Sequence, residues 1–260
     1  MRTPSLAALL LALVGCGSPD APRLDTAADS LAFRVTEAAG GLDTWEALPG
    51  IAFEWAVVRD SVEVARNWHV WDKTGDRVRS EFQIGADSVV VAVFSPSTFD
   101  PASPVGQAAL NGTVLSGEIA SEQLTGAQSR FINDSYWLLA PLKVFDPGVV
   151  RAVETRDNVV GLALSFEDVG LTPGDRYWLA VDDGSGATTG WAFVLESGNE
   201  GDFIWLDPIE LDTPLGPLSF ATEKASRAGG SAILTEPEAL LEIDEALFTD
   251  LTPRNRPSLP

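Results

Sequence analysis

The spacing of apolar residues at the start of the folded region predicts a helix over residues 25–39. The apolar positions recur at helical spacing and are Leu31, Ala32, Val35 and Ala38. Asp25 or Thr26 can cap the first turn, and Gly40-Gly41 ends the helix. We expect one further helical turn over 43–48, stopped by Pro49-Gly50.

From Ile51 the hydrophobic period changes from helical spacing to two, which is typical of half-buried strands. Four alternating segments follow, and short polar turns separate them. Short connections favour antiparallel neighbours, so a meander of strands is predicted. The four strands begin at Ile51, Val62, Val78 and Val89.

The pattern changes twice more. Residues 95–105 are rich in Ser and Pro and predict a loop, 108–114 predict a strand around Asn111-Gly112, and 116–139 predict a helix that Pro141 terminates. The period of two then resumes in six candidate strands: 149–155, 159–166, 177–181, 191–195, 203–206 and 218–222. Residues 236–249 fit either a last helix or a helix-strand tail.

Together these elements predict an α+β fold with about ten antiparallel strands. Helices lie in two places, before the sheet and between its two halves, as in α+β proteins. A sheet of this length usually curls or closes. We therefore expect one domain over residues 25–252, with 253–260 as a flexible tail.

The first 24 residues have the plan of a signal peptide and a tether. A positively charged start precedes the apolar run Leu6 to Val14, which is too short to span a bilayer, for which about 20 residues are needed. Leu13-Val14-Gly15-Cys16 resembles the lipobox of bacterial lipoproteins, whose cysteine is acylated. This predicts a signal peptide over 1–15, lipidation of Cys16 and a tether over 16–24.

The lipobox resemblance implies an address in the bacterial cell envelope. The membrane would be a partner through the acylated Cys16. Gly17 follows the cysteine where Asp would retain a protein at the inner membrane, which favours the outer membrane, facing the periplasm or the cell surface. The alternative is an ordinary secretory signal with a chance cysteine.

The charge balance excludes one class of partner. The chain has 38 acidic and 17 basic residues and a net charge of −21. Nucleic-acid binding needs a basic patch, so no nucleic-acid partner is expected. A strongly charged surface keeps a protein soluble and apart from its neighbours, and we expect a monomer.

Candidate catalytic and metal-binding residues are few. His69 is the one histidine, and its plain interpretation is a half-exposed strand residue. Zinc sites need clusters of His or Cys, so no metal and no cofactor is expected. Carboxylates are abundant enough that a glycosidase pair stays open. Asp182-Asp183-Gly184 and Asn199-Glu200-Gly201-Asp202 are interpreted as turns.

Aromatic residues are the more suggestive group. Several Trp residues on one curved sheet can line an apolar cavity, whereas the alternative is that they fill an ordinary core. The predicted cavity-lining residues are Phe53, Trp55, Trp68, Phe82, Trp137, Trp178, Trp191, Phe193 and Trp205.

Two motifs resemble a family of uncharacterised bacterial lipoproteins. The first is Phe131-Ile132-Asn133-Asp134-Ser135-Tyr136-Trp137 and its continuation to Val149, and the second is Leu171 to Asp182, which contains Tyr177-Trp178-Leu179. Gly40-Gly41-Leu42-Asp43-Thr44-Trp45 also fits. That family is similar to the LolA/LolB-like lipoprotein-carrier superfamily. The resemblance implies an unclosed antiparallel β-barrel with helices on the concave side, which binds acyl chains without covalent chemistry. Lys143 and Asp146 are interpreted as helix-end and turn residues.

Three hypotheses about function follow. The leading one is a lipid-anchored envelope protein, not an enzyme, that binds an apolar ligand such as a lipid or a lipoprotein acyl chain. The second is a scaffold or interaction protein whose barrel is filled by its own side chains. The third is a carboxylate-dependent hydrolase. A cavity larger than about 300 Å³ favours the first over the second.

Overall fold

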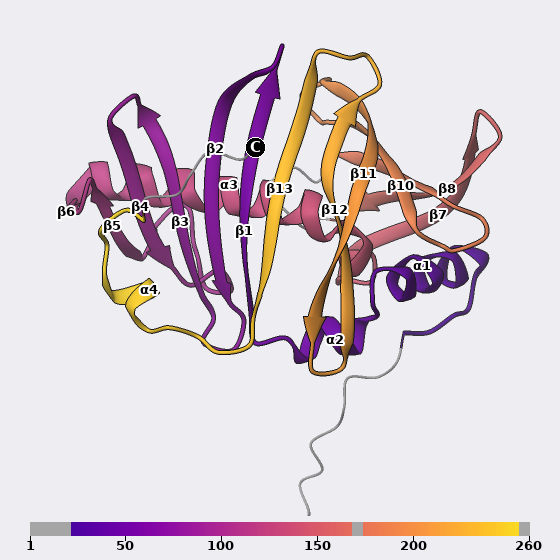
Figure 1. The fold of residues 1–260 in the computed structure, drawn as a ribbon, viewed down its shortest axis with the longest axis horizontal. Coiled ribbons are helices and arrows are strands. Elements are labelled where there is room, and N and C mark those ends of the chain that lie inside the picture. Colours follow the sequence, from indigo (N-terminus) through magenta and orange to yellow (C-terminus); the bar gives the residue numbers. More distant parts are fainter. Residues whose placement is uncertain (1–21, 168–173, 255–260) are drawn as a thin grey trace, which may run out of the picture.

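The computed structural model describes residues 22–167 and 174–254. Their strands form one antiparallel sheet (Figure 1). The chain builds the sheet outward from its centre to one edge and then inward from the other. The first half contains β1 (Gly50–Arg59), β2 (Val62–Asp72), β3 (Arg77–Gly85), β4 (Ser88–Phe94), β5 (Gly106–Leu110) and β6 (Thr113–Val114). The second half contains β7 (Val149–Arg156), β8 (Val159–Phe166), β9 (Arg176–Val181), β10 (Thr188–Val194), β11 (Glu200–Thr213), β12 (Gly216–Ser226) and β13 (Ser231–Leu240).

The strand order is β6-β5-β4-β3-β2-β1-β13-β12-β11-β10-β9-β8-β7. The two edge strands β6 and β7 are not neighbours, so the sheet is unclosed. The α+β class and the curved, unclosed antiparallel sheet with helices are therefore confirmed. The strand count is thirteen among the described residues, where about ten were expected.

In the described part of the chain, four helices accompany the sheet: α1 (Ala27–Ala38), α2 (Leu42–Ala47), α3 (Gly117–Lys143) and α4 (Ala246–Thr249). Helix α3 connects β6 to β7 and runs behind the strands across the width of the sheet in Figure 1. Its 27 residues correspond to a length of about 40 Å. Within 22–167 and 174–254, no helix combines the length and apolar character needed to cross a membrane.

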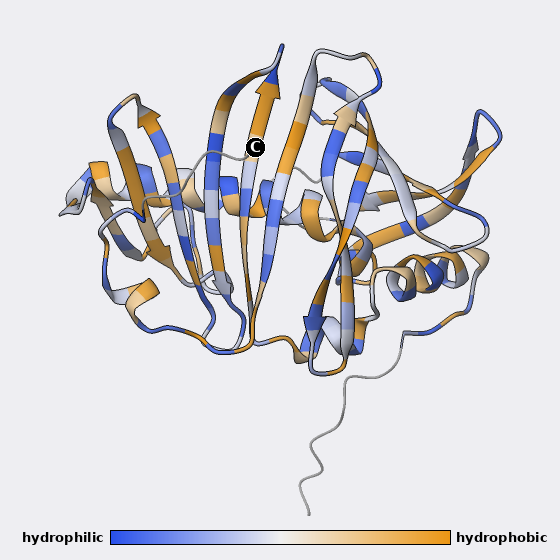
Figure 2. Cartoon of the chain, in the orientation of Figure 1, coloured by the Kyte–Doolittle hydropathy of each residue, from blue (hydrophilic) through white to orange (hydrophobic). Residues whose placement is uncertain are grey.

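Different helices pack on the two faces of the sheet. The inner face packs against α1, α2 and α3, and it carries alternate strand residues such as Phe53, Val78 and Phe82. The outer face carries the other set, in which Trp68 and Val70 pack against Phe248 of α4. Figure 2 shows the corresponding alternation of hydrophobic and hydrophilic residues along the strands.

The inner core consists of two clusters, and α3 contributes to both. Phe131 and Leu138 belong to the cluster over the first half of the sheet, where they meet residues of α2 and of strands β1, β3 and β4. Trp137 and Ala140 belong to the cluster over the second half, where α1 also packs. The helix is thus the element that joins the two halves of the core.

Several elements differ from the sequence predictions, and three of the differences have a clear physical reason. The expected strand over 108–114 is the hairpin β5-β6, because Asn111 and Gly112 both have positive φ and turn the chain. Helix α3 continues through Pro141 to Lys143 instead of ending before it. A proline this close to the C-terminus disturbs only the last turn, and the Thr36 hydroxyl donates a hydrogen bond to the Pro141 carbonyl at 3.1 Å.

The third difference is the central strand β13, which takes up residues 236–240 of the ambiguous tail. Pro237 argues against a central strand in the sequence. The structure admits it because β13 pairs with β12 only through Ala232, Ile233 and Leu234, so Pro237 faces β1 on one side and no paired strand on the other.

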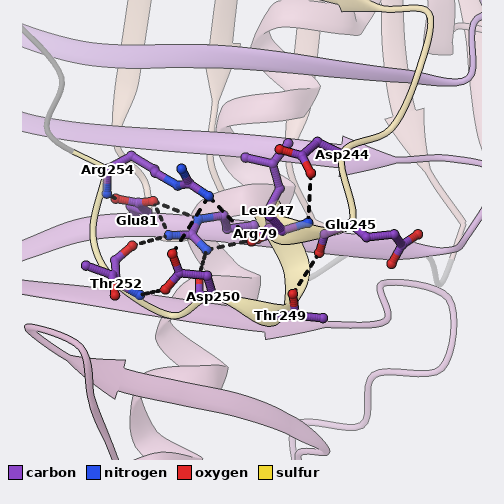
Figure 3. A network of polar contacts seen from close by, with 10 residues as sticks. Arg79, Glu81, Asp244, Glu245, Leu247, Thr249, Asp250, Thr252 and Arg254 are labelled. Atoms are coloured by element: carbon purple, nitrogen blue, oxygen red, sulfur yellow. Dashed lines mark hydrogen bonds and ion pairs between the residues drawn. The ribbon is translucent and has the colours of Figure 1, made fainter.

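The C-terminal segment 244–254 is fixed to the outer face by one buried guanidinium, that of Arg79 (Figure 3). Arg79 donates from Nη1 to the carbonyls of Leu247 at 2.8 Å and Asp250 at 2.5 Å, and from Nη2 to that of Thr252 at 2.8 Å. Its Nε donates to Glu81 at 2.7 Å. One side chain therefore serves three carbonyls of a segment that has little regular structure of its own.

Replacing Phe131 with Ala tests the role of α3 in the core. Phe131 is 4% exposed and packs edge-on against Phe94, Trp71 and His69. We expect a loss of about 3–5 kcal/mol in the free energy of unfolding, measured in urea. Ile119→Ala, on the same helix but 60% exposed, is the control and changes stability by less than about 0.5 kcal/mol. Equal effects of the two substitutions would contradict the packing described.

Replacing Arg79 with Met tests the attachment of the C-terminal segment. The substitution leaves Glu81 buried without its guanidinium, and we expect a loss of about 3–5 kcal/mol together with faster amide exchange over 244–254. Arg156→Met breaks an exposed ion pair with Glu154 and costs at most about 1 kcal/mol. Unchanged exchange over 244–254 in Arg79→Met would refute the attachment.

Candidate functional site

The structure separates the predicted cavity residues between the two faces of the sheet. Seven of them lie on the inner side: Phe53, Trp55, Phe82, Trp137, Trp191, Phe193 and Trp205. Trp68 and Trp178 do not, and including them in one cavity was wrong. Trp68 packs against Phe248 on the outer face. Trp178 alternates with inner-face Tyr177 and Leu179, and its Nε1 donates to the Glu154 carbonyl at 3.2 Å.

Most of the seven inner aromatic residues are core and line no common cavity, because α3 occupies the space that the curved sheet encloses. Trp191 is fully buried, and its ring packs against Trp137 at 5.4 Å and Trp205 at 6.2 Å between centroids. Trp137 is the one member of the predicted set that also lines the pocket described next.

A pocket of about 450 Å³ lies between the C-terminal half of α3 and the strands β8 and β9. We call it the α3 pocket. Its walls are mainly apolar and aromatic, with a few charged groups. The lining residues are Ile132, Asn133, Tyr136, Trp137, Lys143, Asp146, Pro147, Val149, Phe166, Asp175, Tyr177, Leu195 and Ser197.

Three aromatic rings form one wall of the α3 pocket, and we refer to them as the aromatic wall: Tyr136, Phe166 and Tyr177. Each ring lies 5.4–5.6 Å from the other two between centroids. Trp191 supports them from the core, with its ring 4.6 Å from that of Tyr177. Such clustered rings contribute packing energy beyond their buried area, so the wall is a rigid apolar surface.

Two carboxylates of the pocket have defined partners, whereas one buried hydroxyl has none within the described part of the chain. Asp175 is buried and accepts hydrogen bonds from the Tyr177 hydroxyl and the Glu196 N–H, both at 2.8 Å. Lys143 forms an ion pair with Asp146 at 2.5 Å. The buried hydroxyl of Tyr136 has no hydrogen-bond partner among the described residues. A polar atom without a partner beside a pocket indicates a place for a ligand atom or for water.

Both tyrosines of the wall stay protonated at neutral pH. Burial raises the pKa of Tyr136, and the negative charge of Asp146 raises it further. Burial also raises the pKa of Tyr177, with the hydrogen bond to Asp175 adding to the effect. The wall therefore offers neutral rings and neutral hydroxyl groups to anything that enters the pocket.

The two motifs of the sequence meet at this pocket. Residues 131–149 supply its α3 side and its floor, including Tyr136 and Asp146, and the second motif supplies Asp175 and Tyr177. Tyr136 and Tyr177, which the aromatic prediction missed, were thus present in the motifs, whereas Phe166 lies in neither of them. Lys143 and Asp146 are helix-end and turn residues as expected, and they line the pocket as well.

His69 lies in a sealed polar network, contrary to the half-exposed position expected for it. The residue is fully buried, because α3 covers the inner face of β2. Its Nδ1 lies 2.8 Å from the Ser80 hydroxyl, and its Nε2 lies 3.0 Å from Asp134, which also accepts a hydrogen bond from Asn67 at 2.7 Å. The set contains the residue types of a hydrolytic triad. Ser80 is itself fully buried, so the network joins α3 to the sheet and gives a substrate no access to the serine.

Among the described residues, no group of three or more His, Cys, Asp or Glu side chains is placed to hold a metal ion. The Asp182 carboxylate accepts hydrogen bonds from Ser185 N–H and hydroxyl, as in a turn. Cys16, with the predicted signal peptide and most of the tether, lies outside the described residues.

Comparison with known proteins gives structural similarity only. No protein-family model matches the chain, and no curated protein matches it. A LolA superfamily protein from Nitrosomonas europaea aligns with 84% of this chain and 96% of its own, at 13% identity and a TM-score of 0.42. A DUF1329 family protein from Desulfovibrio piger aligns over 82% and 95%, at 10% identity and a TM-score of 0.42. A domain described as that of an outer membrane lipoprotein-sorting protein from Vibrio parahaemolyticus aligns over 84% and 94%, at 10% identity and a TM-score of 0.40. These alignments report similarity of fold to a LolA superfamily protein, which is the resemblance that the two motifs predicted.

Lys224 is the least expected residue of the inner core. It is fully buried between Trp55 and Trp205, with its Nζ 6.0 and 4.9 Å from the two ring centroids, and it donates to the Ala221 carbonyl at 2.9 Å. Burial lowers the pKa of Lys224 to about 7. Keeping this amine protonated inside the core lowers the free energy of unfolding.

Replacing Lys224 with Met tests this cost through its pH dependence. The unfolded chain keeps the amine protonated to about pH 10, so between pH 7 and 10 the unfolded state binds more protons than the folded one. The free energy of unfolding of the native chain therefore rises with pH in this window. We expect Lys224→Met to be the more stable protein at pH 7 and its advantage to shrink by about 2 kcal/mol by pH 9. Urea unfolding at both pH values measures this, and parallel pH profiles of the two proteins would contradict it.

Proposed function

We propose that this protein is a membrane-anchored envelope lipoprotein that binds an apolar ligand, such as a lipid or an acyl chain, in the α3 pocket. The observation that carries the proposal is the pocket itself. Its volume of about 450 Å³ falls within the range of ligand sites, and its walls are mainly apolar with a few polar groups, as such sites usually are.

The physical basis for binding is the removal of apolar surface from water. An alkyl chain gains about 25 cal/mol for each Å² that it buries. The aromatic wall is already packed against Trp191, so a ligand does not have to order these side chains. A pocket that is formed in advance loses less entropy when it is occupied.

The proposed anchor is the acyl group on Cys16. Five residues lie between it and Pro22, where the described chain begins, and the six Cα-to-Cα steps span roughly 20 Å at full extension. A tether of that reach would hold the pocket close to the membrane that supplies its ligand. The proposed location is the envelope, at the outer membrane.

The geometry favours binding over the two other hypotheses. A scaffold with a filled interior would have no pocket above about 300 Å³. A hydrolase would need two carboxylates facing a bond to be broken. Of the two carboxylates in the pocket, Asp146 is engaged by Lys143, and Asp175 by the Tyr177 hydroxyl and a backbone N–H.

Replacing Leu195 with Trp tests the proposal by filling the pocket. The protein carries Cys16→Ser in all samples, which removes the acylation site. The probe is 1-N-phenylnaphthylamine, whose fluorescence rises in apolar sites, with decanol as competitor. We expect Leu195→Trp to weaken probe binding at least tenfold, because the indole occupies the ligand volume.

The control is Leu215→Trp, which adds the same side chain at a position that is 61% exposed and does not line the pocket. It should bind the probe like the parent protein. Absence of probe binding to the parent, or equal binding to Leu195→Trp, would overturn the proposed function.

A further inference from the structure

The charged groups around the α3 pocket are predominantly acidic. Among its lining residues, Asp146 and Asp175 face a single cation, Lys143, and that cation is already paired with Asp146 at 2.5 Å. A ligand that enters the pocket therefore meets one more negative charge than positive charges.

A second hollow next to the pocket is also lined by more acidic than basic residues. It has a volume of about 520 Å³ and shares Asp146 and Pro147 with the α3 pocket. The charged residues that line it are Asp25, Asp29, Glu46 and Asp146 on the acidic side, and Arg23 and Arg151 on the basic side. Arg151 is itself engaged by Asp29, with Nη2 and Oδ1 3.1 Å apart.

The aromatic wall completes a surface suited to a cation. The faces of Tyr136, Phe166 and Tyr177 carry the negative side of the ring quadrupole, which attracts ammonium groups within about 6 Å of a ring centroid. Asp175 is held beside the wall by its hydrogen bond with the Tyr177 hydroxyl.

We propose that the ligand of the α3 pocket is an amphiphile whose polar end carries a cationic amine. This inference rests on the proposed function and adds the chemistry of the headgroup to it. The alkyl part lies against the apolar lining, and the ammonium lies between the aromatic wall, Asp175 and the acidic rim at Asp146. An anionic headgroup at the same place would meet the net negative charge that remains after Lys143 pairs with Asp146, so it is disfavoured.

The test compares three ligands with the same alkyl chain: decylammonium, decanol and decanoate. Binding to the Cys16→Ser protein is measured by calorimetry in 150 mM salt, below the concentrations at which the ligands form micelles. We expect decylammonium to bind at least tenfold more tightly than decanoate, with decanol between them. Asp175→Asn should reduce the preference for decylammonium severalfold, because the amide keeps the shape of the side chain and loses its charge.

Two controls separate the pocket from the acidic surface of the whole molecule. Glu210→Gln removes an exposed charge on β11 that does not line the pocket, and it should leave the preference unchanged. Leu195→Trp should abolish decylammonium binding. Binding that survives Leu195→Trp would show attraction to the general surface and would overturn the inference.

The remaining outcomes test the cationic headgroup separately from the binding of an apolar ligand in the α3 pocket. Equal affinities for the three ligands, or tightest binding of decanoate, would overturn the cationic headgroup and leave the apolar pocket standing. Failure of all three to bind would remove the proposed function as well.

Discussion

Helix α3 connects the two edges of an unclosed sheet, so its side chains have to fill the inner face of both halves at once. Phe131 and Leu138 serve one half, and Trp137 and Ala140 serve the other. The same helix also carries the buried Asp134, whose carboxylate forms hydrogen bonds with His69 and Asn67 of the sheet. The position of α3 thus decides which inner-face residues become core and where space is left over.

The α3 pocket is the space left over at one end of this arrangement. Along most of its length the helix packs its side chains into the two core clusters. Near Lys143 the helix ends and the chain turns through Asp146 and Pro147 toward β7. There Phe166 and Tyr177 of the strands and Tyr136 of the helix line a pocket that their side chains leave open. The candidate ligand site is a consequence of where a long helix stops.

Much of the fold follows from periodicity, since the helix before the sheet, the meander and the long central helix were each predicted within a few residues. Strand β13 was missed because Pro237 is incompatible with a strand that is paired on both sides. The sequence does not reveal that β12 diverges there. Side-chain alternation contains the information that Trp68 and His69 lie on opposite faces. It does not say which face a later helix will cover, so Trp68 was placed in the cavity and His69 near solvent.

The candidate site was predicted in part. Trp137 was named for its residue type, whereas Tyr136 and Tyr177 were passed over although both stand in the motifs that carry the resemblance to known lipoproteins. Large aromatic residues are as common in cores as in pockets, and their number alone cannot distinguish the two. The distinction depends on which rings face an end of α3, and that is a property of packing between elements that lie far apart in the sequence.

The pairing of β1 with β13 has a consequence for how the molecule is made. Gly50 lies opposite Leu240, so the centre of the sheet joins a strand produced early to one of the last strands produced. Local hairpins can form within each half as the chain is synthesised. The pairing of β1 with β13 forms only after β13 has been made, and it closes a loop of nearly the whole domain. Until that moment β1 presents an unpaired edge to its surroundings, and such edges pair readily with other chains. In this topology the early half keeps an exposed strand edge until β13 has been made.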